Sequence, residues 1–237
     1  LELKLKEERK WKMKFLTDCC KGFEGLNFDE MELDLFWWTC HKPRINWSDP
    51  NLYYCVAVII FNPVFWNCAS RYEYRTSFLT RLFGSKKIAC AVFCCIIAIL
   101  ALFRFNTFYH AVTPQESWPL LDHMVIRTIG QVLTASGVVM ATWAVVALNF
   151  YGYGFADSFD ILMEERVTSF PFNVFNNPMY LGSTLEYVGA SLVAASPAGM
   201  LLSALIGAMY LIALHFEEPF TAMIYADKAN QNIRKEN

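Results

Sequence analysis

The stretch TIGQVLTASGVVMATWAVVALNFYGYGFA, residues 128–156, contains no charged side chain over its 29 residues. A helix of this length rises about 44 Å at roughly 1.5 Å per residue. The hydrocarbon core of a bilayer is roughly 30 Å thick. The stretch therefore predicts a helix that crosses a membrane.

Two shorter uncharged runs precede it, at residues 52–70 and 88–103. The first contains Asn62-Pro63 near its middle. Because proline removes a backbone donor and clashes with the preceding turn, this run either spans with a kink or dips in and returns. The second has only 16 residues, but Lys87 and Arg104 can snorkel toward water at its two ends.

A fourth run, residues 187–216, has 30 uncharged residues and is broken by Ser196-Pro197-Ala198-Gly199. It is too long for one upright span. It predicts either a strongly tilted helix or a hairpin that turns at Pro197.

The composition agrees with a membrane protein. Hydrophobic residues make up 55% of the 237 residues and charged residues only 18%, against about 25% charged in a soluble domain. Backbone polar groups in lipid need internal partners, so we expect an all-α, polytopic transmembrane helix bundle. It should have about four membrane-embedded segments, the first of them kinked or re-entrant. A net charge of −2 argues against nucleic-acid binding.

Charge in the loops predicts the orientation. Residues 71–87 carry five basic side chains against one acid, which places this segment in the cytoplasm. Residues 104–127 would then face the lumen, and residues 157–180 the cytosol. Residues 1–49 are expected to form a separate cytosolic or interfacial extension of unknown role, and residues 50–237 the membrane-embedded domain.

Several chemistries are excluded by the motifs. The four histidines are scattered along the chain, and the eight cysteines form no Cys-x-x-Cys pair, so we expect no metal. The chain contains neither a P-loop nor a glycine-rich dinucleotide motif.

Polar residues gather in residues 157–187 and at Glu217-Glu218-Pro219, at the end of the last run. Adjacent carboxylates at a membrane boundary are costly unless they bind something, although a helix end meeting water is the alternative.

Five ordered motifs resemble the phospholipid methyltransferase family. They are FPFNVFNNPMYLGST (170–184), ASPAG (195–199), FEEPFTAMIY (216–225), FNPVFWN (61–67) and LFGS (82–85). The resemblance covers residues 49–229. A looser resemblance, in the Asn-Pro-x-Tyr and Glu-Glu elements, reaches the isoprenylcysteine carboxyl methyltransferases.

The resemblance implies an enzyme of the endoplasmic reticulum membrane and its mitochondrial contacts. It would methylate the amine of phosphatidylethanolamine three times with S-adenosylmethionine and yield phosphatidylcholine. The family's cofactor site implies roles for Glu217 and Glu218, and for a Gly-x-Gly stretch that aligns with Ala135-Ser136-Gly137. Ser136 and Gly137 match this stretch, whereas Ala135 departs from its first glycine. Gly152-Tyr153-Gly154 competes for the same role and lies on the expected cytosolic side.

The sequence leaves the roles of the other aromatic and acidic residues open. The ring faces of Phe170, Phe172 and Tyr180 can bind a cationic head group or a sulfonium. We include Tyr180 in the predicted cofactor site. The alternative is that these aromatic side chains anchor the protein at the membrane interface. Glu186, Asp157, Asp160 and the Glu217-Glu218 pair are candidate bases, and none is singled out. The rival functions are carboxyl methylation of a prenylated cysteine and a non-catalytic scaffold or lipid carrier.

Overall fold

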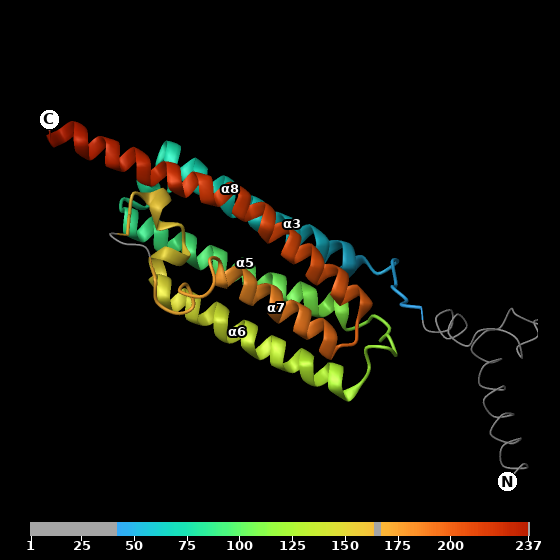
Figure 1. The fold of residues 1–237 in the computed structure, drawn as a ribbon. Helices are drawn as coiled ribbons and strands as arrows, with labels where there is room; N and C mark the ends of the chain where they lie inside the picture. The colour runs from blue at the N-terminus through green and yellow to red at the C-terminus, as the bar shows by residue number, and fades with distance from the viewer. Residues whose placement is uncertain (1–41, 164–166, 237) are drawn as a thin grey trace, which may run out of the picture.

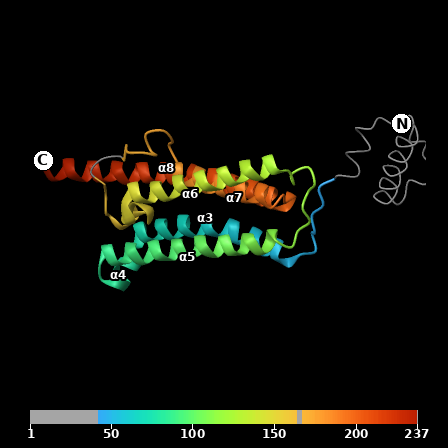
Figure 2. The ribbon, with the colours of Figure 1, turned by 90° about the horizontal axis from the view of Figure 1, so that it is seen from below.

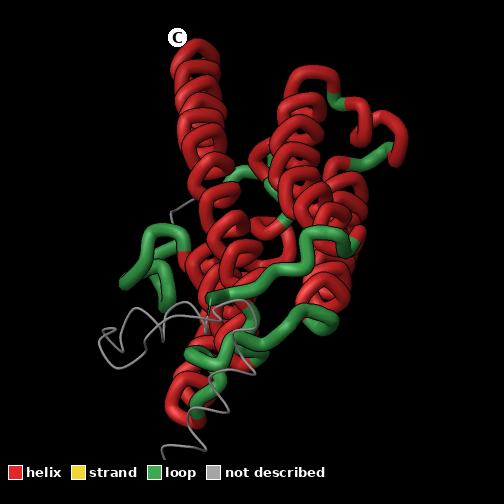
Figure 3. Tube along the Cα trace, turned by 90° about the vertical axis from the view of Figure 1, so that its right-hand side faces the viewer, coloured by secondary structure: helices red, strands yellow, loops and turns green. Residues whose placement is uncertain are grey.

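The computed structural model describes residues 42–163 and 167–236, and this part of the chain is helical without a strand (Figure 3). Its elements are α3 (Pro50–Thr76), α4 (Phe78–Phe83), α5 (Lys86–Val112), α6 (Met124–Tyr153), the 3-10 helix η1 (Ala156–Phe159), α7 (Pro178–Val193) and α8 (Pro197–Glu236). Four helices are long and apolar enough to cross a membrane: Pro50–Thr76, Lys86–Val112, Met124–Asn149 and Pro197–Asn230. The predicted all-α bundle with about four embedded segments is confirmed.

The long helices run side by side along one axis (Figure 1). Seen along a perpendicular direction, α3 and α5 form one layer, and α6, α7 and α8 form the other (Figure 2). Apolar side chains from α3, α5, η1, α7 and α8 share one core. Many side chains on the outer face of α6 remain exposed, as expected for a helix that faces lipid.

Helix α3 crosses the bundle once. The Asp49 side chain accepts a hydrogen bond from the Asn51 amide, and Pro50 occupies the first turn, where a missing N–H costs nothing. The helix then continues through Pro63 to Thr76. The re-entrant alternative for the first run is therefore not the observed one, because a single helix carries the chain from one end of the bundle to the other.

Residues 71–87, 152–163 and 217–228 meet at one end of the bundle, here called the basic end. Tyr74 on α3 donates to Asp227 on α8 (3.1 Å), and Lys86 on α5 pairs with Asp160 after η1 (2.5 Å). The opposite end joins other segments: the Trp118 amide donates to the Ala195 carbonyl at 2.7 Å.

The single crossing of α3 places residues 42–49 at the end of the bundle opposite to residues 71–87, where the Asn46 amide donates to the Gln115 side chain (2.9 Å). If residues 71–87 are cytosolic, residues 42–49 lie at the other face of the membrane. The cytosolic or interfacial place of the extension stays a prediction. Residues 1–41 lie outside the described part of the chain.

The fourth run folds as a hairpin. Helix α7 ends at Val193, and α8 begins at Pro197 after a short turn in which the Ser196 side chain accepts from the Gly199 amide (3.1 Å). Serine followed by proline is a strong helix start. The predicted turn at Pro197 is confirmed, and it returns Glu217 to the basic end.

Glycines allow α7 to lie very close to α6. A Cβ atom added to Gly137 would lie 2.5 Å from the Gly182 carbonyl oxygen, and one added to Gly189 would lie 2.5 Å from the Gly130 carbonyl oxygen. Small residues at a membrane interface permit this backbone approach. The pairing fixes the axial position of α7, and with it the position of the aromatic residues at its start.

The orientation can be tested with single cysteines at Ser169, Ala229 and Glu116, in a background without native cysteines. The first two positions lie at the basic end and the third at the opposite end. We expect an impermeant maleimide to label Ser169 and Ala229 in cytosol-side-out vesicles, and to label Glu116 only after detergent is added. Labelling of Glu116 in sealed vesicles, with the other two protected, would reverse the predicted orientation.

Candidate active site at the basic end of the bundle

The Glu217 carboxylate on α8 is the centre of a half-buried hydrogen-bond cluster. One oxygen accepts from the Trp66 indole N–H (2.8 Å) and the Asn67 amide (2.7 Å), and the other accepts from the Tyr180 hydroxyl (2.7 Å). The donors come from α3 and α7, so three helices meet at this one side chain. A carboxylate in a membrane span is expensive unless its oxygens are satisfied in this way.

Arg71 holds the α3 side of this cluster in place. It donates to the Asn67 side-chain oxygen (2.8 Å) and to the Phe216 carbonyl (2.7 Å), and its guanidinium lies 4.5 Å from the Phe220 ring centre. Because Arg71 occupies the Asn67 oxygen, the Asn67 NH₂ group is directed to Glu217.

The second acid of the pair behaves differently. Glu218 is exposed and accepts a hydrogen bond from the Asn177 side chain (3.1 Å). Asn177 precedes α7 and belongs to the same motif as Tyr180. The Asn-Pro-Met-Tyr segment therefore contacts both carboxylates.

Aromatic rings extend the cluster into the bundle. The Tyr180 ring lies between Trp66 and Tyr210, with centroid distances of 6.4 and 4.6 Å. Beyond it, the Tyr210 hydroxyl contacts the Ser183 hydroxyl at 2.9 Å. Ring faces next to a carboxylate suit a cationic group such as a sulfonium or a methylated amine.

Arg104 lies at the inner end of this path, and the expectation that it snorkels to water is wrong. Helix α5 continues to Val112, and Arg104 is only 6% exposed. Its guanidinium contacts the Tyr187 hydroxyl (3.3 Å) and lies 5.4 and 5.2 Å from the Tyr187 and Tyr210 ring centres. Internal partners replace water, although within the described residues no carboxylate oxygen lies within 4.0 Å of it.

The predicted Gly-x-Gly residues occupy another surface. Gly137 is buried against α7, with Gly182 and Glu186 as its neighbours, whereas Ser136 is exposed and donates to the Leu133 carbonyl (3.0 Å). The structure thus brings Tyr180 together with Glu217, but it does not show Ser136 or Gly137 in this cluster. The competing Gly154 packs against Cys90 and Cys94.

The candidate bases differ in their surroundings. Burial raises the pKa of the Asp157 carboxyl, which accepts from Thr221 at 2.9 Å, one turn beyond Glu217. Hydrogen bonds from Lys228 and Lys86 lower the pKa of Asp160. Glu186 is half-buried and packs beside Gly137. Asp157 is therefore the stronger base of the two loop acids, and it contacts α8 one turn beyond Glu217.

Other residues stand apart or were missed. Phe170 is 48% exposed, and Phe172 is half-buried in the same loop. Sequence reasoning assigned no role to Trp66, Asn67 or Arg71. The feature of the sequence that could have indicated these three residues is that they are polar or amphipathic side chains at the end of an otherwise apolar run.

Together these features define a multi-pass helical membrane protein with a half-buried cluster of a carboxylate and aromatic rings near one end of the bundle. The profile of the phospholipid methyltransferase family matches residues 125–228. The chain belongs to this family, as the following relatives establish.

A phosphatidylethanolamine N-methyltransferase of Rattus norvegicus is 44% identical over 184 residues, which cover 78% of this chain and 92% of the relative. The enzyme of that name from Homo sapiens is 42% identical, covering 79% and 94%. A phosphatidyl-N-methylethanolamine N-methyltransferase of Saccharomyces cerevisiae is 41% identical, covering 75% and 87%. No solved structure gives a significant match.

Proposed function

We propose that the protein methylates the amine of phosphatidylethanolamine three times, through mono- and dimethyl intermediates, and yields phosphatidylcholine. The observation that carries this proposal is the identity of 42–44% to phosphatidylethanolamine N-methyltransferases over nearly their whole length. Glu217, Glu218 and Tyr180 lie inside the region that the family profile matches, whereas Trp66 and Asn67 precede it.

The methyl donor in this proposal is S-adenosylmethionine, which supplies an electrophilic methyl group on a sulfonium. The residues present fit such a group, because the Glu217 carboxylate is flanked by the Trp66 and Tyr180 rings. We assign Glu217, Glu218 and Tyr180 to donor binding. Ser136 and Gly137 remain a prediction from the family motif, since Gly137 faces α7.

The reaction needs a neutral amine, because an ammonium has no lone pair with which to attack. Nitrogen forms the new bond to the methyl carbon as the sulfur–carbon bond breaks, and the first two products then lose an N–H proton. We propose Asp157 as the acceptor of this proton, since burial raises its pKa and Thr221 ties it to α8 beside the Glu pair. Helices that meet at Glu217 hold the reactants in line.

We further propose that the protein resides in the endoplasmic reticulum membrane, including its contacts with mitochondria. Four apolar helices fit a multi-pass protein. The basic end would face the cytosol, where the methyl donor is supplied.

The test is methyl transfer from radiolabelled S-adenosylmethionine by purified protein in lipid nanodiscs. Phosphatidylethanolamine and its mono- and dimethyl derivatives should all become labelled, and phosphatidylcholine should accumulate. A prenylated cysteine should stay unlabelled. The fungal relatives take their names from the monomethyl lipid, so labelling of only the methylated acceptors would restrict the function to the last two steps. Failure to bind the donor in calorimetry would favour a non-catalytic scaffold.

A further inference from the structure

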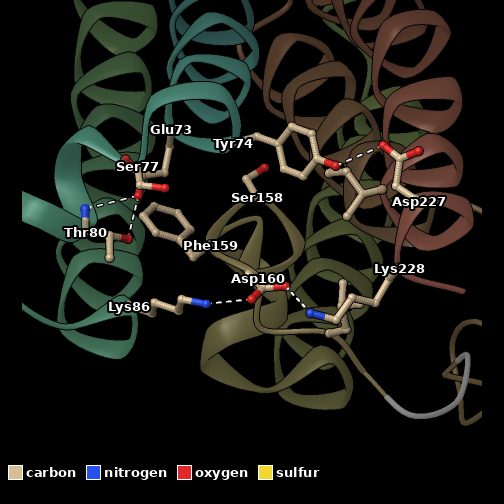
Figure 4. Close-up of a pocket in the computed structure, with 12 residues that line it drawn as sticks. Glu73, Tyr74, Ser77, Thr80, Lys86, Ser158, Phe159, Asp160, Asp227 and Lys228 are labelled. Carbon is tan, nitrogen blue, oxygen red and sulfur yellow. Dashed lines mark hydrogen bonds and ion pairs between the residues drawn. The ribbon is translucent and has the colours of Figure 1, made fainter. Parts of the chain in front are cut away.

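A polar cavity of about 410 Å³ lies at the basic end, outside the Glu217 cluster. Side chains from α3, α5, η1 and α8 surround it (Figure 4). Phe159 and Ile224 supply apolar walls, and the rest of the lining is mostly polar or charged. The cavity lies where the phosphate groups of the adjoining leaflet are expected, because the spanning helices end here.

Two lysines converge on one carboxylate in this cavity. Lys86 and Lys228 contact the two oxygens of Asp160 at 2.5 and 2.7 Å. All three side chains are between 37% and 50% exposed, so the ammonium groups are open to a ligand. These three side chains together carry a net charge of +1, which favours an anion next to the lysines, although Glu73 and Asp227 bring the whole lining to −1.

The Ser158 hydroxyl is a second feature that points to a ligand. Ser158 is only 4% exposed and lines the cavity, yet its Oγ has no hydrogen-bond partner among the described residues. Leaving a buried hydroxyl unpaired costs about 1–3 kcal/mol. A ligand oxygen in the cavity would accept from it.

The opposite wall carries negative charge. Asp227 accepts only from the Tyr74 hydroxyl (3.1 Å) among the described residues. Glu73 differs, because both of its oxygens are used by the first turn of α4, at Leu79 and Thr80. Asp227 keeps this wall negative, so an anion is favoured only on the side of the two lysines.

We propose that this cavity binds the head group of the phospholipid substrate, with its phosphodiester on Lys86, Lys228 and Ser158 and its amine directed away from Asp227, toward Asp157. This proposal rests on the proposed function and names the lipid's site within it. Ser158 follows Asp157, whose contact to Thr221 connects the cavity to the helix of the Glu pair. Asp160 holds the two lysines when no phosphodiester is bound, and it competes with the lipid for them.

The kinetic test separates the lipid from the methyl donor, whose amino-acid end also carries an anionic group. In mixed micelles with varied phosphatidylethanolamine, Lys86→Gln and Lys228→Gln should each raise the KM for the lipid about tenfold. The KM for S-adenosylmethionine should stay at the wild-type value. Lys87→Gln, an exposed neighbour outside the cavity, is the matched control and should leave both constants unchanged.

The variant Asp160→Asn shows whether the two lysines bind the lipid or only form a structural ion pair. Removing the competing carboxylate should lower the KM for the lipid by about threefold, the size expected for an exposed ion pair. If the ion pair were only structural, its loss would raise this KM, as the lysine variants do. A rise for Asp160→Asn, an unchanged lipid KM in the lysine variants, or a rise in the donor KM instead would overturn the proposal. An inactive wild-type protein would instead contradict the proposed function itself.

Discussion

Glu217→Gln is expected to lower kcat/KM about 100-fold, a loss of about 2.7 kcal/mol of transition-state stabilisation. Glutamine has the same shape, and its oxygen still accepts from Trp66 and Asn67. Its NH₂ group donates to the Tyr180 oxygen, because a hydroxyl both donates and accepts. The cluster therefore keeps its hydrogen bonds and loses only the negative charge that would face the sulfonium donor.

Initial rates and the thermal unfolding midpoint in detergent should be measured together. The midpoint should stay near that of the wild type. Glu218→Gln should lose less activity, since Glu218 is exposed and accepts one hydrogen bond. Glu116→Gln, an exposed acid at the opposite end, is the matched control and should be fully active. Near-normal turnover by Glu217→Gln would remove this carboxylate from the donor site.

Gly137→Ala is expected to destabilise the bundle by about 1–3 kcal/mol, and Gly137→Val by more, because overpacking forces backbone shifts. The new Cβ would lie 2.5 Å from the Gly182 carbonyl oxygen and 2.6 Å from the Glu186 nitrogen. Both neighbours are backbone atoms that cannot move away as a flexible side chain does. Helix α7 must therefore separate from α6, and Tyr180 moves with it.

Thermal unfolding followed by size-exclusion chromatography measures this loss. Val139→Ala is the matched control, because Val139 lies on the same helix and is 57% exposed. The donor affinity of the folded fraction then decides the cofactor role of Gly137. An unchanged unfolding midpoint with lost donor affinity would show that Gly137 contacts the donor and not only α7.

The spanning helices and the place of a possible turn could be predicted because their causes are local. Uncharged runs marked each spanning helix, and Ser196-Pro197 marked the turn at α8. The first run left two alternatives, since Pro63 is compatible with either a continuous or a broken helix. Packing against α5 and α8 is consistent with the continuous one.

The candidate site was only half predictable. Glu217, Glu218 and Tyr180 could be named as candidates because the resemblance to the phospholipid methyltransferases covers them. The position of the two acids at the end of an apolar run left a helix end meeting water as the alternative. Trp66 and Asn67, the partners of Glu217, lie about 150 positions away in the chain. Arg104 was misplaced because an arginine bordering an uncharged run gives the same pattern whether it reaches water or a buried tyrosine.

The sequence by itself therefore determined that this chain forms membrane-spanning helices and that a turn in the fourth run, if there is one, lies at Pro197. The tertiary structure decided that the run does turn there and so returns Glu217 to the basic end. Apolar length, helix caps and charge bias act within a few turns, so they need no knowledge of the rest of the chain. Only the tertiary structure decided which side chains satisfy Glu217, that Arg104 points inward, and that Gly137 lies against α7. Those pairings depend on the rotation and axial shift of each helix against its neighbours, and these follow from close packing between surfaces that are far apart in sequence.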